Sequence, residues 1–180
     1  MRPDQDLAYL TGAALSGVGH ILDAFRPDRV IVQGDTTTTF AGALAAFYHK
    51  IPVAHVEAGL RTDNIYAPWP EEVNRRLVSH VADLHFAPTA RARDNLLREG
   101  IGDERIVVTG NTGIDALLWV SALLDERAAL RSRGEKILAG HGRDRRLILM
   151  TGHRRESFDG GLDPDLQRNR ADRRGEGRRR

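Results

Sequence analysis

RVIVQGDTTTT, at residues 29–39, is the stretch that decides the fold. Residues 29–33 form an apolar run that predicts a short, fully buried strand, and Gly34-Asp35 turns the chain into a helix. Further strands are predicted over residues 52–56, 84–87, 105–109 and 147–151, with helical segments between them. Strands that alternate with helices predict right-handed βαβ units, and therefore a Rossmann-like parallel sheet of the α/β class, covered on both faces.

Three of the predicted helices carry apolar residues at steps of three and four, which predicts one buried face on each. They are the helix over residues 7–25, the helix after Asp35, and the helix that opens at Pro70-Glu71, where proline suits a first turn. The predicted buried faces are Leu7, Leu10, Ala14, Val18, Ile21 and Phe25; Phe40, Leu44 and Phe47; and Val73, Leu77 and Val81.

The composition bounds the class of protein. The 180 residues are 41% hydrophobic, enough for a buried core, and the lack of cysteine excludes a disulfide framework, thiolate metal sites and a cysteine nucleophile. No apolar run is long enough for a membrane span or a signal peptide, so we expect a cytoplasmic chain without a membrane partner. Residues 163–180 carry a net charge of +3 and the remainder −1, so the basic character belongs to the tail.

The pattern along the chain predicts four parts. Residues 1–124 read as a partial N-terminal Rossmann-like domain, and residues 125–146 as a further helix and an interdomain linker. Residues 147–158 read as the first strand and turn of a second domain. Residues 159–180 are Arg-rich and offer almost nothing to bury, so we expect disorder there.

Candidate functional residues follow the predicted strands, because ligands of open parallel sheets bind beyond the carboxyl ends of the strands. Asp35, Glu57 and His153 each come directly after a strand, and Glu71 and Arg75 stand on the helix after the second strand. A divalent metal held by Asp35, His55, Glu57 and His153 is conceivable, but no tight ligand motif supports it and we expect no metal. The sequence has neither a phosphate-binding loop ending in GK[ST] nor a full dinucleotide fingerprint.

Each candidate also has a structural interpretation. Asp35 can alternatively be interpreted as no more than the N-cap of the helix that follows it. Glu71 with Arg75, and Glu72 with Arg76, have the i,i+4 spacing of surface ion pairs, which is the interpretation we favour from spacing alone. His55 lies within a strand and is interpreted as a packed core histidine.

Five motifs, in order along the chain, resemble those of the non-hydrolysing UDP-N-acetylglucosamine 2-epimerases. They are GDTTTT (34–39), HVEAGLR (55–61), PWPEEVNR (68–75), TGN (109–111) and TGHRRESF (151–158). The resemblance implies a glycosyltransferase-B-like, two-domain architecture of which mainly the N-terminal domain is present. It also implies interconversion of UDP-GlcNAc and UDP-ManNAc with no cofactor, and a homodimer for the intact family.

The resemblance assigns roles to nine residues. Elimination of UDP to a 2-acetamidoglucal and re-addition on the other face requires carboxylates on both faces of C2 and cations for the leaving pyrophosphate. Asp35, Glu57 and Glu71 resemble the acid/base carboxylates, and Arg75 and His153 the cationic, UDP-contacting partners. Thr36, Arg61, Arg154 and Glu156 are the expected substrate-binding residues.

The sequence also departs from the family at both ends. Family members have an opening strand before the segment that matches Met1, and its loss would leave the strand at 29–33 without a neighbour. The resemblance ends at Phe158, so we expect a truncated chain with weak or no activity when tested alone. An alternative is a non-catalytic fragment that associates with a partner chain through an exposed sheet edge. Nucleic-acid binding by the tail rests on charge alone, and we expect none.

Overall fold

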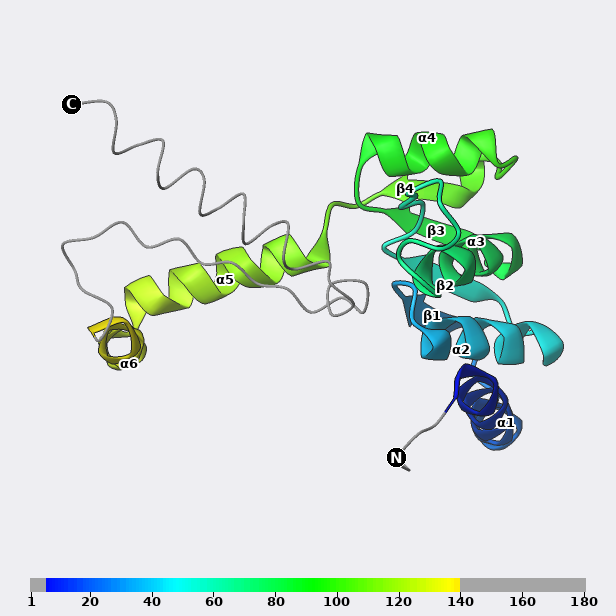
Figure 1. Ribbon diagram of the computed structural model, residues 1–180, viewed down its shortest axis with the longest axis horizontal. Coiled ribbons are helices and arrows are strands. Elements are labelled where there is room, and N and C mark those ends of the chain that lie inside the picture. Colours follow the sequence, from blue (N-terminus) through cyan, green and yellow to red (C-terminus); the bar gives the residue numbers. More distant parts are fainter. Residues whose placement is uncertain (1–5, 140–180) are drawn as a thin grey trace. The chain divides into compact units, whose positions relative to one another are not determined.

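The computed structural model describes residues 6–139 (Figure 1). The chain divides into two compact units, with the boundary between Asn111 and Thr112. No helix in this described part is long and apolar enough to span a bilayer. The first unit contains α1 (Leu7–Phe25), β1 (Val30–Gln33), α2 (Thr37–Tyr48), β2 (Val53–Val56), α3 (Glu71–Val81), β3 (Leu84–Ala87), α4 (Ala90–Arg98), the 3₁₀ turn η1 (Asp103–Arg105) and β4 (Ile106–Val108). The second contains α5 (Thr112–Glu126) and α6 (Ala128–Leu138).

The four strands form one parallel sheet in the order β1-β2-β3-β4, which confirms the predicted α/β class. In Figure 1 the strands are stacked in this order from β1 to β4. β1 pairs only with β2 among the described strands, so it forms one edge of the sheet that they make. The predicted strand at 147–151 lies outside the described residues.

The prediction that both faces of the sheet are covered is wrong for the described residues. Each of α2, α3 and α4 joins two adjacent strands, and right-handed crossovers in sequential order all pass over the same face. Two core clusters fill that face: Val32 and Val53 pack with Val78 of α3, and Ala87 packs with Leu96 of α4.

The opposite face of the sheet is open at both of its edges. Ile31 of β1 is 68% exposed and Val107 of β4 is 44% exposed. The expectation of a fully buried strand at 29–33 is therefore wrong, because β1 is an edge strand with helices on only one of its faces.

The buried faces of the helices also differ from the predicted ones. In α1 the predicted residues Leu7, Leu10, Ala14 and Val18 are partly buried, Leu22 is fully buried, and Ile21 and Phe25 are exposed, because α1 packs mainly on α2. In α2 the predicted residues Phe40 and Leu44 are partly buried and Phe47 is exposed, while alanine and glycine take the fully buried positions, because α2 is packed closely between α1, α3 and the sheet.

Helix α3 shows the largest difference from the prediction. Val73 is 36% and Leu77 41% exposed, and Val81 is only partly buried. The buried positions are Glu72, Asn74, Arg75, Val78 and Ser79. These polar side chains can be buried because each has hydrogen-bond or ion-pair partners inside the protein.

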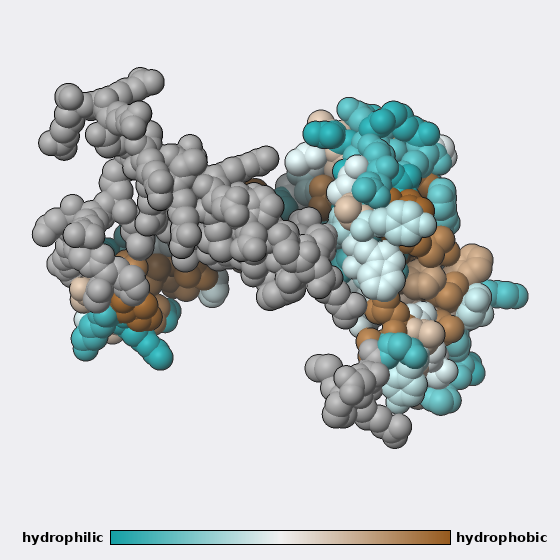
Figure 2. Space-filling view, in the orientation of Figure 1, coloured by the Kyte–Doolittle hydropathy of each residue, from teal (hydrophilic) through white to brown (hydrophobic). Residues whose placement is uncertain are grey.

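Helices α5 and α6 confirm the expected helices after residue 111. Their apolar side chains are exposed in the described structure, among them Leu117, Leu118 and Trp119 of α5 and Ile137 of α6. Figure 2 shows brown, hydrophobic side chains beside teal ones around α6, whereas the charged surface of α4 is teal.

Candidate active site

The turn from β1 into α2 carries the first candidate carboxylate. Thr36 is the N-cap of α2, and its hydroxyl oxygen accepts a hydrogen bond from the Thr39 amide at 3.2 Å. Asp35 stands one residue before the cap, so the interpretation of Asp35 as the helix cap is wrong. Its carboxylate is 30% exposed and accepts an ion-pair contact from the Arg75 guanidinium at 2.9 Å.

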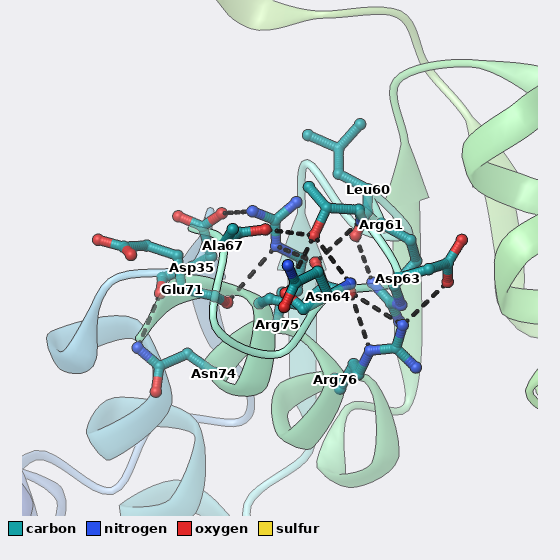
Figure 3. A network of polar contacts seen from close by, with 12 residues as sticks. Asp35, Leu60, Arg61, Asp63, Asn64, Ala67, Glu71, Asn74, Arg75 and Arg76 are labelled. Carbon is teal, nitrogen blue, oxygen red and sulfur yellow. Dashed lines mark hydrogen bonds and ion pairs between the residues drawn. The ribbon is translucent and has the colours of Figure 1, made fainter. Parts of the chain in front are cut away.

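Arg75 reaches this turn from α3, as Figure 3 shows. The Arg75 side chain is 9% exposed, and its Nε lies 3.4 Å from the backbone oxygen of Glu71 and 3.5 Å from a carboxylate oxygen of Glu72. The interpretation of Glu71 and Arg75 as a surface ion pair is therefore wrong. The guanidinium points into the protein, where the Asp35 and Glu72 carboxylates compensate its charge.

Glu72 is a buried anchor that sequence reasoning missed. Its carboxylate is 0% exposed, accepts a hydrogen bond from the Thr62 amide at 3.1 Å, and pairs with Arg76 at 2.9 Å. The predicted i,i+4 pair with Arg76 thus forms, but it is not a surface pair, because α3 is rotated so that Glu72 faces inward. Through the hydrogen bond from the Thr62 amide, the Glu72 carboxylate connects the loop after β2 to α3.

Glu57 and Glu71 lie at the same carboxyl end of the sheet. Glu57 directly follows β2 and has a φ of 68°, in the left-handed region that few non-glycine residues occupy. A Cβ built on Gly34 would lie 3.8 Å from Oε2 of Glu57, which places that carboxylate against the turn that carries Asp35. Glu71 is the first residue of α3, and its backbone contacts Arg75. Asp35, Glu57, Glu71 and Arg75 are therefore gathered at one end of the sheet.

His55 is a core histidine, as predicted. Its imidazole is 0% exposed, and Nε2 lies 2.8 Å from the backbone oxygen of Gly34, so Nε2 carries the hydrogen. Burial lowers the pKa of His55 to about 4, which keeps the ring neutral near pH 7. Burial also lowers the pKa of His85, the neighbour of His55 on β3.

Arg61 makes a different set of contacts. Its side chain is 2% exposed; Nε and Nη2 donate to the two carboxylate oxygens of Glu99 at 2.7 and 2.6 Å, Nη1 donates to the Leu60 oxygen, and Nη2 donates to the Ser79 hydroxyl. These hydrogen bonds lower the pKa of Glu99. Within the described residues the polar contacts of Arg61 join α3 to α4, and none reaches Asp35; a substrate-binding role for Arg61 stays a prediction.

The remaining predicted site residues are His153, Arg154 and Glu156, which lie outside the described residues. Between residues 6 and 139, no three histidine, aspartate or glutamate side chains are grouped so that they could hold a metal ion.

Comparison with known proteins places this arrangement in a family. The family profile described as UDP-N-acetylglucosamine 2-epimerase matches residues 2–163. The chain is 52% identical over 163 residues to the UDP-N-acetylglucosamine 2-epimerase of Yersinia pestis. The aligned residues make up 91% of this chain and 43% of that protein. It is 53% identical over the same length to the enzyme of Escherichia coli K12, again with 91% and 43% coverage.

Solved structures give the same result. The UDP-GlcNAc 2-epimerase of Neisseria meningitidis, solved with bound UDP-GlcNAc, superposes with a TM-score of 0.83 at 48% identity, over 87% of this chain and 42% of that one. The Methanocaldococcus jannaschii enzyme in complex with UDP-GlcNAc and UDP gives a TM-score of 0.69 at 43% identity, over 74% and 36%. The chain spans less than half the length of these relatives. On its sequence and its fold, the chain belongs to the UDP-N-acetylglucosamine 2-epimerase family.

Proposed function

We propose that the chain carries the proton-transfer residues of an enzyme that interconverts UDP-GlcNAc and UDP-ManNAc. The observation that carries the proposal is the ion pair between Asp35 and Arg75 at the carboxyl end of a parallel sheet, with Glu57 beside the same turn. The names of the relatives support the reaction, and the Neisseria meningitidis structure with bound UDP-GlcNAc supports the substrate.

The reaction explains why carboxylates are needed. The hydrogen on C2 of the sugar is not adjacent to a carbonyl, so its direct removal would leave an unstabilised carbanion. Elimination breaks the C2–H and C1–O bonds and forms the C1–C2 double bond of a 2-acetamidoglucal, while UDP leaves with the bonding electrons. Re-addition of UDP at C1 and of a proton to the other face of C2 gives the epimer, so one group must remove a proton and another must return one.

Asp35, Glu57 and Glu71 are the proposed acid and base groups. Asp35 is partly exposed and can reach a ligand, and its carboxylate lies 2.9 Å from the Arg75 guanidinium. The left-handed backbone of Glu57 also supports a functional role, because sparsely populated conformations cluster at active sites.

The other assignments extend the proposal to binding. Arg75 and His153 are the proposed cationic groups that stabilise the negative charge on the departing UDP. Thr36 at the N-terminus of α2, together with Arg61, Arg154 and Glu156, are the proposed substrate-binding residues. Hydroxyl and amide groups at a helix N-terminus suit a phosphate or a sugar oxygen.

Deuterium exchange tests the reaction. The chain is incubated with UDP-GlcNAc in D₂O, and deuterium at C2 and the appearance of UDP-ManNAc are followed by NMR. We expect slow incorporation that the Asp35→Asn variant abolishes. The matched control is Asp103→Asn, because Asp103 is also paired with an arginine, Arg93 at 2.7 Å, but lies on η1 away from the turn.

A chimera with a longer relative tests the proposed acid and base residues separately from any effect of the short length of this chain. Residues 2–163 replace the matching segment of the Escherichia coli enzyme, with which they share 53% identity. The chimera should epimerise UDP-GlcNAc, and Asp35→Asn in the chimera should lower the rate by about a hundredfold or more. An active chimera that is insensitive to Asp35→Asn would refute the assignment.

A second candidate is a non-catalytic chain that associates with a partner. The position of β1 at the edge of the described sheet and the exposure of Ile31 within it favour this candidate, because an edge strand can pair with another chain. Light scattering of the purified chain tests it. A monomer that unfolds in one cooperative transition would rule the candidate out.

A further inference from the structure

The last residues of β1 and the turn after it are held by side chains as well as by strand pairing. Three consecutive backbone carbonyl groups each accept a hydrogen bond from a polar side chain, and each side chain comes from a different element. The pairs are Gln33 O with Thr39 Oγ1 of α2 at 2.7 Å, Gly34 O with His55 Nε2 of β2 at 2.8 Å, and Asp35 O with Asn74 Nδ2 of α3 at 2.9 Å.

All three donors are shielded from water. Thr39 is 7%, His55 0% and Asn74 7% exposed. Because the donors are shielded from water, each of these side chains would lose its hydrogen-bond partner if the turn moved away, which makes the bonds costly to break.

These hydrogen bonds determine how Asp35 is presented. The peptide plane before Asp35 contains the Gly34 carbonyl, and the plane after it contains the Asp35 carbonyl. His55 holds the first plane and Asn74 the second. With both flanking planes fixed, the direction of the Cα–Cβ bond of Asp35 is fixed too.

We propose that Thr39, His55 and Asn74 are positioning residues for Asp35. They act through the backbone and do not touch the substrate. Because these bonds do not involve the Arg75 side chain, they hold the Cα–Cβ direction of Asp35 independently of the ion pair that Arg75 makes with its carboxylate. The functional part of this inference rests on the proposed epimerase activity.

Amide hydrogen exchange tests whether the side chains hold the turn. The Gly34 amide, which donates to Val56 O at 3.0 Å, reports on the turn, and the Thr109 amide, which donates to Ala87 O, reports on the far edge of the sheet. In Asn74→Leu and His55→Leu, which remove the donors, Gly34 should exchange about tenfold faster while Thr109 is unchanged. His55→Gln keeps a donor near the position of Nε2 and should restore the slow exchange.

Ser79→Ala is the matched control. Ser79 is also buried on α3 and also hydrogen-bonded, but to Arg61 and to the backbone of Arg75, not to the turn. Its removal should leave the Gly34 exchange rate unchanged. If Asn74→Leu fails to fold, Thr39→Val, which replaces the hydroxyl by a methyl group of similar volume, makes the same comparison.

Measurement of kcat and KM then distinguishes a positioning role of these side chains from a merely structural role. In the deuterium-exchange assay, Asn74→Leu should lower kcat about tenfold and leave KM unchanged, and His55→Gln should retain kcat. Unchanged Gly34 exchange in both leucine variants, or accelerated exchange without a loss of kcat, would overturn the inference. If the unsubstituted chain incorporates no deuterium, the proposed activity of the chain fails instead, and the exchange rates alone decide whether the side chains hold the turn.

Discussion

The buried imidazole of His55 should make the stability of the chain depend on pH. Burial lowers its pKa from 6.5 to about 4, and unfolding restores the ordinary value. Between these two values the unfolded chain binds more protons than the folded chain, so the free energy of unfolding falls as the pH falls from 6.5 towards 4. The stabilisation is fully present above pH 6.5.

The magnitude follows from the shift. About 2.5 pH units at about 1.4 kcal/mol each give about 3 to 4 kcal/mol, a large part of the stability of a typical domain. The free energy of unfolding is measured by urea titration at several pH values from 4 to 7.5. In His55→Gln, which does not titrate but keeps a donor for the Gly34 carbonyl, the pH dependence should become shallower by about this amount.

Subtracting the two titration series isolates His55. Protonation of buried His85 and of the paired carboxylate of Glu99 also destabilises the folded chain in acid, and the subtraction removes the part of these contributions that does not depend on His55. Gly12→Ala, at an exposed position of α1 without a titratable side chain, is the control and should leave the pH dependence as it is. If His55→Gln and the unsubstituted chain show the same slope between pH 4 and 6.5, the reasoning is refuted.

Three further substitutions test the packing of the first unit by urea unfolding. Glu72→Gln keeps an acceptor for the Thr62 amide but removes the buried charge that pairs with arginine, and should lower the free energy of unfolding by about 3 kcal/mol; a loss below 1 kcal/mol would contradict the buried anchor. Gly59→Ala should cost about 3 kcal/mol or more, because its φ is +85° and its methyl group would lie 2.2 Å from the Ala92 oxygen. Gly12→Ala in α1, where nothing lies within 4 Å, should instead stabilise by about 0.5–1 kcal/mol, and a destabilisation there would show that the helix is packed differently.

The order of elements could be predicted from the sequence, but not which surfaces they bury. The strands at 30–33 and 53–56 lie within one residue of the apolar runs that predicted them. That Ile31 is exposed depends on the strand order and on the side of the sheet to which the crossovers run. Neither property is a local pattern, so periodicity alone could not reveal it.

In the candidate site, too, some features could be predicted from the sequence and others could not. Positions after strand ends were enough to predict that Asp35 and Glu57 lie at the same end of the sheet, because the carboxyl ends of parallel strands share an edge. The partner of Arg75 could not be found that way. Sequence spacing favours Glu71 four residues earlier, whereas the structure pairs Arg75 with a carboxylate 40 residues away. Asn74 and Thr39 carried no signal, since a polar residue on a helix is usually exposed.

The rotation of α3 has a consequence for how the chain folds. Its local apolar pattern favours burial of Val73 and Leu77, and native packing turns these residues outward. Local preference and native contacts therefore conflict in this helix, which is energetic frustration in the sense used for folding landscapes. The contacts of Glu72 and Arg75 stabilise only the native rotation of α3 about its axis, and they form only after the segments that they connect have come together. We therefore expect α3 to adopt its native rotation late in folding, after the turn that follows β1 and the loop that follows β2 have reached their native positions.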